Sequence, residues 1–322
     1  PADGVALWPK DDLLTCEEIG TIVRSAISEH GIRRFKLTGG EPTVRRGLVD
    51  LVRQLRAIDG VEDLSLTTNG ELLTDLAQPL YEAGLDRVTI SIDSLRADRF
   101  KRITRTGNLD VVLRGLDRAI DVGMRSIKIN CVTMRGVNDD EVSDFAKLTI
   151  DRPITVRFIE YMPLGDSAVQ SPVLPLTVAE DETGPRGGCG AQDRGDVFVS
   201  ETEVRDRIEN DLGPLIEVER SLEAGVGPAV PYRLANAKGR VGFISAMSAP
   251  FCSTCNRLRL TATGVLRSCL FEGGEVDLRP ILRGDSSQPI ATRIAQAMTD
   301  CVRLKPEVHS RHGNEQMSRI GG

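Results

Sequence analysis

The sequence predicts an α/β protein made of parallel βαβ units, arranged either as a barrel or as a doubly wound sheet. Two observations support this fold class. Short β-branched or apolar runs alternate with helix-length stretches through the first two-thirds of the chain. Each run also ends in a turn rich in Gly, Asn, Asp, Ser or Thr. Because the loops after the strands carry the site of a (βα) barrel, we expect functional residues in these turns.

Five strands and their helices follow in order. Thr15 and Glu18 form the pattern of a capping box, which predicts a helix that stops at His30-Gly31. A second helix carries an apolar face of Leu48, Leu51, Val52 and Leu55. The predicted strands cover residues 35–38, 64–67, 87–92, 127–132 and 155–160. The chain enters this pattern with a helix, so we expect that a strand is missing in front of Thr15.

The regular alternation ends after Gly165, and the rest of the chain is more irregular. Gly and Pro crowd residues 166–199, a helix is predicted for 201–212, and short strands and turns follow up to about residue 270. We therefore predict four parts: a partial barrel at 1–165, a loop-rich insertion at 166–199, a C-terminal region at 200–304, and a tail at 305–322 that ends in Gly-Gly.

Composition excludes several classes of partner. Aromatic residues make up only 4% of the 322-residue chain, and the net charge is −6, so neither base stacking nor a polyanion-binding surface is expected. No apolar run is long enough to span a membrane. Seven cysteines are too few for a disulfide scaffold, and their odd number fits reduced thiols. We expect a cytoplasmic protein that binds neither nucleic acid nor membrane.

Cys252, Cys255 and Cys269 form the most informative motif, with the spacing C-x2-C-x13-C. A CxxC pair directs two thiolates at one metal, and a third cysteine after a hairpin-length excursion can reach the same metal. The set fits zinc with a fourth ligand from elsewhere, or a [4Fe-4S] cluster with one open iron. No histidine lies close in sequence, which favours the cluster. A redox CxxC and unligated core thiols are the alternatives.

Several cationic residues are candidates for an anion site. Arg257 and Arg259 alternate between the second and third cysteines, which predicts that both lie on one face of a strand. Fixed guanidinium groups suit phosphate, whereas a solvated strand edge is the alternative. Lys36 and Lys128 lie in the middle of predicted strands. They face either an anion in the barrel lumen or an outward polar position.

Two further stretches have weaker signals. Thr38-Gly39-Gly40-Glu41-Pro42 follows a strand, and its glycines let the backbone approach a ligand while Glu41 offers an acceptor to an ammonium group. The alternative is an ordinary turn. The chain ends in Met317-Ser318-Arg319-Ile320-Gly321-Gly322, which is either a disordered end or a segment slim enough to enter a narrow cavity.

Taken together, these stretches resemble the GTP 3′,8-cyclase family of molybdenum cofactor biosynthesis, which are radical S-adenosylmethionine (SAM) enzymes. The resemblance runs along nearly the whole chain except 166–199, and it rests on LTGGEPTVRR, LTTNGELL, RVTISIDSL, IKINCVTMRGVNDDE, VRFIEYMP, GFISAMSAPFCSTCNRLRLTATGVLRSCLF and MSRIGG. It implies an incomplete (βα)6 TIM-like barrel followed by a C-terminal α+β iron–sulfur region. It also implies conversion of GTP to (8S)-3′,8-cyclo-7,8-dihydroguanosine 5′-triphosphate, the first step of molybdopterin biosynthesis and a lyase reaction.

The resemblance also implies roles for individual residues. Three cysteines would hold a C-terminal [4Fe-4S] cluster whose open iron binds guanine: Cys252, Cys255 and Cys269. The implied GTP contacts are Lys36, Thr67, Lys128, Arg257, Leu258 and Arg259. The implied SAM contacts are Gly40, Glu41, Ser91 and Met162. The implied catalytic tail residues are Arg319, Gly321 and Gly322. At position 36 the family usually has Arg, so Lys36 keeps the charge but loses the bidentate fork.

One departure from the family pattern concerns a second cluster. The family's CxxxCxxC loop, which holds the [4Fe-4S] cluster that cleaves SAM, does not occur in the 322 residues. In relatives Met-Pro follows that motif directly, and this sequence begins at Pro1. We therefore expect the chain as given to be inactive alone, although it binds GTP through its C-terminal cluster.

The resemblance implies partners as well: GTP, SAM, an electron donor, a downstream cyclic pyranopterin monophosphate synthase and a second copy in a homodimer. Two alternatives to this function stay open. A radical SAM enzyme acting on another substrate would use the C-terminal cysteines for an auxiliary cluster and would not bind GTP. A non-enzymatic zinc-binding domain would be colourless and hold one zinc ion.

Overall fold

The computed structural model describes residues 8–164, 197–219, 227–271 and 274–309. An eight-stranded sheet organises the chain, in the order β1-β2-β3-β4-β5-β8-β7-β6. Strands β1 to β5 and β8 run parallel, and β7 and β6 extend the sheet in antiparallel fashion. Their bounds are Arg34–Leu37, Asp63–Thr68, Arg87–Ser91, Ser126–Thr133, Ile154–Glu160, Arg240–Ile244, Val230–Arg233 and Ile216–Glu217, in sheet order. The expected α/β fold class is confirmed.

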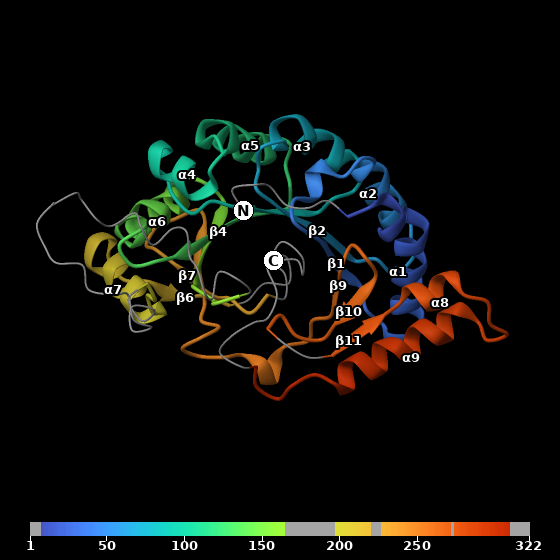
Figure 1. The fold of residues 1–322 in the computed structure, drawn as a ribbon. Coiled ribbons are helices and arrows are strands. Elements are labelled where there is room, and N and C mark those ends of the chain that lie inside the picture. The colour runs from blue at the N-terminus through green and yellow to red at the C-terminus, as the bar shows by residue number, and fades with distance from the viewer. Residues whose placement is uncertain (1–7, 165–196, 220–226, 272–273, 310–322) are drawn as a thin grey trace, which may run out of the picture.

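Helices cover the outer, convex face of this curved sheet (Figure 1). They are α1 (Cys16–His30), α2 (Leu48–Arg56), α3 (Leu73–Glu82), α4 (Ala97–Thr104), α5 (Leu109–Asp121), α6 (Val142–Asp151) and α7 (Glu201–Leu212). Between β1 and β5 each strand is joined to the next by at least one helix, which produces the parallel βαβ units that the alternation predicts. Figure 1 shows an open arc of strands rather than a closed ring.

The five predicted strands are all present, and the structure adds a sixth parallel strand. This is β8, which pairs with β5 from Thr155 opposite Arg240 to Ile159 opposite Ile244. Before α1 the structure describes a short 3-10 helix, Lys10–Asp12, and no strand. Strand β1 pairs with β2 alone among the described strands and forms an edge of the sheet.

Helix boundaries follow the capping signals in the sequence. The Thr15 side chain accepts a hydrogen bond from Glu18 N and the Glu18 side chain accepts one from Thr15 N, so the predicted capping box is present. Gly31 ends α1 with φ of 64°, a left-handed conformation that favours glycine. In α2, the four apolar residues that predicted the helix are all buried. Helix α7 spans the predicted 201–212 and also begins with a capping box, formed by Ser200 and Glu203.

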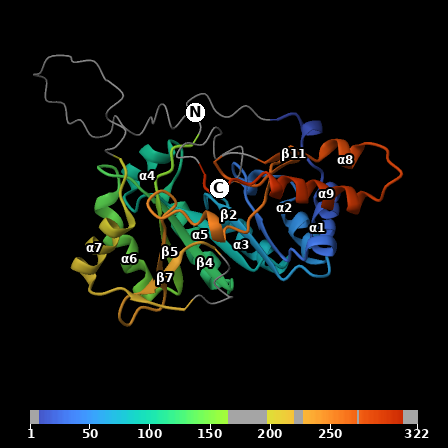
Figure 2. The same cartoon turned by 90° about the horizontal axis from the view of Figure 1, so that it is seen from below.

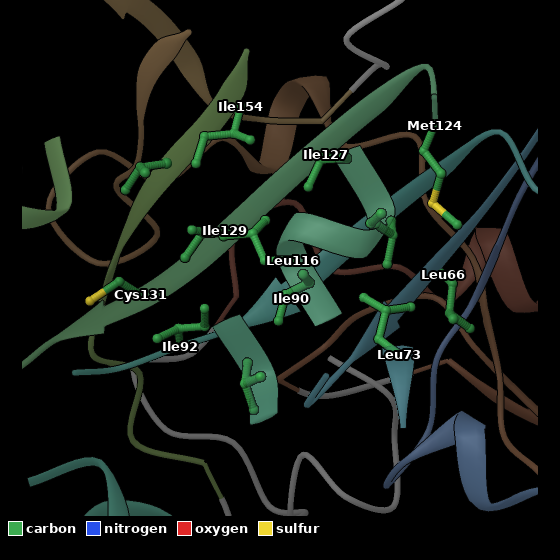
Figure 3. Close-up of a cluster of buried hydrophobic side chains, with 14 of the residues drawn as sticks. Leu66, Leu73, Ile90, Ile92, Leu116, Met124, Ile127, Ile129, Cys131 and Ile154 are labelled. Atoms are coloured by element: carbon green, nitrogen blue, oxygen red, sulfur yellow. The ribbon is translucent and has the colours of Figure 1, made fainter. Parts of the chain in front are cut away.

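The main core lies between the sheet and the helices (Figure 3). Residues at alternate strand positions point into it, including Leu66, Ile90 and Ile129, and they pack against helix residues such as Leu73 and Leu116. All five of these side chains are buried. Because strand side chains alternate between faces, the other positions of these strands must point to the concave face, which we call the inner face.

The C-terminal region forms a second, smaller core against the beginning of the barrel. It contains a three-stranded antiparallel sheet of β9 (Arg259–Leu260), β10 (Val265–Arg267) and β11 (Glu275–Asp277), together with α8 (Arg279–Arg283) and α9 (Ile290–Arg303). Leu266, Ile294 and Met298 pack against Ile22 and Ala26 of α1. Figure 2 shows α9 lying beside α1, while α6 and α7 lie at the opposite end of the molecule.

Some predictions fall on other parts of the chain. The insertion at 166–199 lies outside the described residues except for its last three positions, and so do the tail residues Arg319, Gly321 and Gly322. Among the helices that the structure describes, none is both long enough and apolar enough to cross a membrane.

Candidate functional site

The inner face of the sheet is polar along its length. Register places Thr67 of β2 beside Thr89 of β3, and Thr89 beside Lys128 of β4. In the next row, Asn130 of β4 lies beside Arg157 of β5. The neighbouring positions of these strands point into the apolar core, so the mid-strand lysines face inward and not toward the helices. The sequence left open whether Lys128 faces inward or outward, and the structure shows that it faces inward.

Three cations of this face are brought together from three strands. Protein surrounds Lys36 of β1 although its side chain stays accessible to solvent, and the lost hydration, followed by the charges of Arg157 and Arg87, lowers its pKa to about 7. Burial and the same two arginines lower the pKa of Lys128 to about 6. Burial likewise lowers the pKa of Arg157 to about 10. These cationic groups repel one another, and such a cluster is expected where the site binds an anion.

Unpartnered polar atoms on the same face strengthen this interpretation. Thr67 Oγ1, Asn130 Oδ1 and Arg157 Nε are buried and have no hydrogen-bond partner within the described part of the chain. The Arg157 guanidinium otherwise makes one long hydrogen bond, from Nη2 to Thr89 Oγ1 at 3.4 Å. Buried polar atoms normally have partners, so the Arg157 Nε donor and the Thr67 hydroxyl, both left over beside several cations, fit an anionic ligand. The Asn130 amide oxygen can only accept a hydrogen bond, so it would need a donor group of that ligand.

The amino ends of the strands close this face with an ion-pair network. Asp63, at the start of β2 and 5% exposed, accepts hydrogen bonds from Arg87 Nη2 and, at 3.0 Å, from Arg125 Nη2. The negative charge of Asp63 also raises the pKa of Lys36 and Lys128, but loss of hydration and the neighbouring cations lower both pKa values by more. Arg87 is therefore paired with a carboxylate, whereas Arg157 has no carboxylate partner among the described residues.

At the carboxyl ends of β1 and β2, Glu41 ties two turns together. Its carboxylate accepts hydrogen bonds from Thr43 N at 2.9 Å, from Thr68 Oγ1 at 2.7 Å and from Asn69 N at 2.6 Å. Gly40 and Ser91 are exposed at this end of the sheet, and Met162 is half-buried just after β5. The four residues with implied SAM contacts thus lie at or just after the carboxyl ends of β1, β3 and β5, which meet at the same edge of the sheet. Hydrogen bonds from the protein itself hold Glu41 there.

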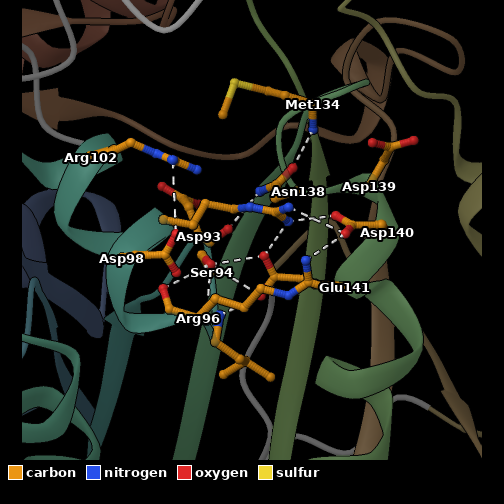
Figure 4. A network of polar contacts seen from close by, with 12 residues as sticks. Asp93, Ser94, Arg96, Asp98, Arg102, Met134, Asn138, Asp139, Asp140 and Glu141 are labelled. Carbon is orange, nitrogen blue, oxygen red and sulfur yellow. Dashed lines mark hydrogen bonds and ion pairs between the residues drawn. The ribbon is translucent and has the colours of Figure 1, made fainter. Parts of the chain in front are cut away.

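A buried network joins the turns that follow β3 and β4 (Figure 4). Burial raises the pKa of Asp93 to about 6, although its carboxylate accepts a hydrogen bond from Val132 N at 2.8 Å. The Asn138 amide donates to the carbonyl oxygens of Asp93 and Val132. Glu141, fully buried, accepts from Ser94 Oγ at 2.8 Å and from Leu95 N at 2.6 Å. This network fixes the loops beside Ser91.

The first two cysteines lie on one tight turn, as the CxxC spacing predicts. A 3-10 turn spans Cys252–Thr254, and Cys255 N donates to Cys252 O at 3.1 Å. Burial raises the pKa of Cys255, but hydrogen bonds and charge from Arg257 outweigh it and bring the pKa down to about 7. The Arg257 guanidinium also lies over the Phe251 ring, 5.2 Å from its centroid. Arg257 precedes β9 and is not part of the strand, so the expected strand carries Arg259 alone.

Arg259 connects the third cysteine to this turn. Burial lowers the pKa of Arg259 to about 10, the charge of Arg257 lowers it further, and the thiol groups of Cys255 and Cys269 act in the opposite direction. Both thiols therefore lie near one guanidinium. Cys252, Cys255 and Cys269 are all unoxidised and half-buried, and thiols are the ligands that an iron–sulfur cluster requires. Within the described ranges, no three His, Cys, Asp or Glu side chains are gathered closely enough to hold a metal ion.

The beginning of the tail packs against the cysteine turn. Lys305 Nζ donates a hydrogen bond to Cys255 O. The His309 ring stacks on Phe271 at 4.0 Å between centroids, and His309 Nε2 lies 3.1 Å from Ala246 O. The described part of the tail thus runs next to the cysteines, although the expected Arg319 and Gly-Gly positions lie beyond it.

Sequence reasoning missed Arg157 and Asp93 as members of the site. Arg157 stands at an alternate position of a predicted strand between apolar neighbours, the same signal that singled out Lys36 and Lys128. Asp93 directly follows the predicted strand at 87–92, and nothing in the local sequence shows that it would be buried.

Comparisons with known proteins identify the family of the chain. The family model described as "Radical SAM superfamily" matches residues 4–149, and "Molybdenum Cofactor Synthesis C" matches residues 182–311. Coproporphyrinogen III oxidase from Escherichia coli, a solved radical SAM enzyme, aligns with a TM-score of 0.34 and 14% identity over 44% of this chain and 36% of that chain, a likeness too slight to support an argument.

Curated relatives cover the chain from end to end. The GTP 3′,8-cyclase of Pelotomaculum thermopropionicum is 45% identical over 100% of this chain and 91% of its own length. The GTP 3′,8-cyclases of Moorella thermoacetica and Alkaliphilus metalliredigens are 43% and 42% identical over the same shares. Radical SAM proteins use a [4Fe-4S] cluster and SAM. The chain therefore belongs to the GTP 3′,8-cyclase family of radical SAM proteins.

Proposed function

We propose that the chain binds GTP between the cations of the inner face and the cysteine turn, as a GTP 3′,8-cyclase of molybdenum cofactor biosynthesis. One observation supports this most strongly: Arg257 belongs to both places. Its charge lowers the pKa of Lys36 and of Arg157 in the sheet, and its charge and hydrogen bonding lower the pKa of the Cys255 thiol. A ligand held by the sheet cations would therefore extend to the turn that carries the cysteines.

The sheet cations would bind the triphosphate. Lys36, Lys128 and Arg157 supply positive charge from three strands, and the unpartnered Thr67 hydroxyl supplies a hydrogen bond. Guanidinium and ammonium groups gathered in a poorly hydrated place bind phosphate strongly, because the ligand relieves their mutual repulsion. Arg257, Leu258 and Arg259 would contact the nucleoside end, close to the cysteines.

SAM would bind at the carboxyl ends of the strands, next to Gly40, Glu41, Ser91 and Met162. Glu41 acts there through its hydrogen bonds to Thr68 and Asn69, which hold the turns after β1 and β2 together. A [4Fe-4S] cluster and SAM would supply the radical chemistry that abstracts hydrogen from the ribose of GTP. The protein residues would orient the two substrates toward each other, and Asp93 and Glu141 would keep the loop after Ser91 in place.

Cys252, Cys255 and Cys269 would hold a second [4Fe-4S] cluster that leaves one iron open to the guanine. The donor set fits, because three free thiols are available and two of them, Cys255 and Cys269, interact electrostatically with the Arg259 guanidinium. Since the described residues do not gather three ligands in advance, we infer that cluster binding draws the turn at 252–255 and the segment around Cys269 together. The tail residues Arg319, Gly321 and Gly322 would enter the same site, next to Lys305 and His309.

Iron counting tests the cluster proposal. The 322 residues contain no CxxxCxxC motif, so we propose that this polypeptide loads one cluster and binds GTP without converting it. Anaerobic reconstitution should give close to four irons per chain, since each [4Fe-4S] cluster holds four. A content near eight irons, or one zinc ion without iron–sulfur absorbance, would contradict the proposal.

Calorimetry tests the GTP site directly. GTP should bind the reconstituted protein, and Lys128→Met should weaken that binding while the exposed Lys147→Met on α6 leaves it unchanged. Equal affinities in the two variants would refute the assignment of the inner face. An electron donor, a downstream cyclic pyranopterin monophosphate synthase, a homodimer and a cytoplasmic location are the further expectations of the same proposal.

A further inference from the structure

Glu160 lies where the pairing of two barrel strands ends. Strands β5 and β8 pair in parallel up to Ile159 opposite Ile244, and Glu160 is the next residue of β5. Its side chain is 4% exposed. After Ile244 the chain leaves strand β8 and continues toward Cys252. The backbone amides of this segment no longer pair with a neighbouring strand, so they need other hydrogen-bond acceptors.

The Glu160 carboxylate supplies those partners. Oε2 accepts hydrogen bonds from Met247 N and from Ser248 N, both at 2.9 Å. Oε1 accepts from the Ser248 hydroxyl and, at 3.3 Å, from Glu201 N at the start of α7. One buried carboxylate thus binds two successive amides of the segment that leads to the cysteines, and charge-assisted bonds of this kind are roughly twice as strong as neutral ones.

The same segment is held from the other side by the C-terminal part of the chain. His309 Nε2 contacts Ala246 O at 3.1 Å, and Lys305 donates to Cys255 O. Between these two attachments the turn at 252–255 is stabilised, as far as the described residues show, by local contacts: its own 3-10 hydrogen bond, hydrogen bonds from Thr254 to Phe251 O, and the stacking of Arg257 on Phe251. Its place relative to the sheet therefore depends on residues outside it.

We propose that Glu160 is a positioning residue for this turn: by fixing Met247 and Ser248 at the end of β5, it sets where Cys252, Cys255 and Arg257 stand relative to the cations of the inner face. This inference rests on the proposed function for its consequence in GTP binding. Within the described residues Glu160 makes its hydrogen bonds to Glu201, Met247 and Ser248 and not to the cysteines or the cations, so it acts through the backbone of the segment at 245–250.

Hydrogen–deuterium exchange on the metal-free full chain tests the attachment itself. Glu160→Ala should raise the exchange rate of the Met247 and Ser248 amides tenfold or more, because both lose their acceptor. Glu160→Gln should raise it less, since one oxygen still accepts. Glu141→Gln is the matched control: Glu141 is also buried and also accepts from a backbone amide, but it holds the loop after β3. It should leave exchange at 245–250 unchanged.

Binding measurements then test the consequence. In reconstituted protein, Glu160→Gln should weaken GTP binding about tenfold and lower the iron content, while Ser248→Ala, which removes only the hydroxyl contact, should have a smaller effect in the same direction. If Glu160→Ala does not fold, Glu160→Gln and Ser248→Ala carry the test alone.

Two results would overturn the proposal, and a third concerns only the proposed function. Unchanged exchange at 245–250 in Glu160→Gln would show that the carboxylate does not hold the segment. Faster exchange spread evenly over β5 and α7 would show a general structural role instead. Failure of the wild-type chain to bind GTP would refute the proposed function while leaving the exchange result as it stands.

Discussion

The inner face of the sheet and the cysteine turn lie beside each other, yet the protein holds them in different ways. The cations of the inner face sit on strands whose opposite side is buried in the main core, so strand register alone sets their spacing. The cysteine turn has no such support. Glu160 holds the segment before it, and Lys305 holds the turn itself.

This difference predicts different responses to substitution. A change on the inner face should remove a charge without moving its neighbours, because the backbone stays in the sheet. A change at or near the cysteine turn should alter position as well as chemistry. The following experiments probe this contrast, beginning with the largest expected effect.

Replacing a cysteine should have the largest effect. Cys255→Ser should abolish iron loading at the C-terminal site, because a hydroxyl is a poor ligand for an iron–sulfur cluster. Iron content and visible absorbance after reconstitution measure this. Cys16→Ser on α1 is the control, since Cys16 is likewise half-buried and unoxidised but lies outside the motif. Equal iron loss in both variants would contradict the assignment of Cys255 as a cluster ligand, because Cys16 lies outside the motif.

Removing a cation of the inner face should weaken GTP binding strongly without unfolding the protein. For Arg157→Met we expect a loss of about 2–5 kcal/mol, a roughly 30-fold or larger rise in Kd, as for other buried charge contacts. The ligand-free variant should be at least as stable as the parent, because Arg157 repels its cationic neighbours. Calorimetry and thermal unfolding measure the two effects. Arg118→Met, on the exposed side of α5, should change neither.

The lysines make the inner face sensitive to pH. Loss of hydration inside the surrounding protein, followed by the charges of Arg157 and Arg87, lowers the pKa of Lys36 from 10.5 to about 7, although its side chain stays accessible to solvent. Between these values the unfolded chain therefore holds a proton that the folded chain has lost. By linkage, ligand-free stability should rise with pH across that window. GTP should raise the lysine pKa values, so binding near pH 7.5 should take up protons and weaken as pH increases.

Calorimetry in buffers of different ionisation enthalpy counts those protons. Lys36→Arg should take up fewer, because a guanidinium stays charged throughout this range. Equal uptake in Lys36→Arg and the parent would show that Lys36 is not the titrating group.

The smallest expected effect concerns helix α1, which packs in both the main core and the smaller C-terminal core. Helix α1 contributes Val23 to the main core and Ile22 and Ala26 to the C-terminal core. Loss of its cap in Thr15→Ala should cost about 1 kcal/mol of unfolding free energy and should destabilise both regions. Ser200→Ala removes an equivalent capping box from α7, whose buried residues Val204 and Ile208 belong to the main core, so its effect should be largest there. Hydrogen exchange separates the two outcomes.

The sequence predicted much of the fold because its local signals agree with one another. Apolar runs that alternate with helix-length stretches located the five strands from β1 to β5, and the pair Thr15 and Glu18 located the start of α1. Strand β8 was not predicted as part of the barrel, because a short run such as Arg240–Ile244 can join any sheet and its partner β5 is distant in sequence. Arg257 was placed on a strand because alternation alone does not show where a strand begins.

By itself the sequence determined the family, the parallel α/β architecture and the chemical types of the site: thiols at a CxxC spacing and cations at alternate strand positions. These depend on residue identity and short-range spacing, which the chain carries directly. Only the tertiary structure decided that Lys36, Lys128 and Arg157 share one face, that Arg257 links them to Cys255, and that Glu160 holds the segment between. Those relations join strands far apart along the chain, and they arise from register, burial and long-range hydrogen bonds that no local pattern encodes.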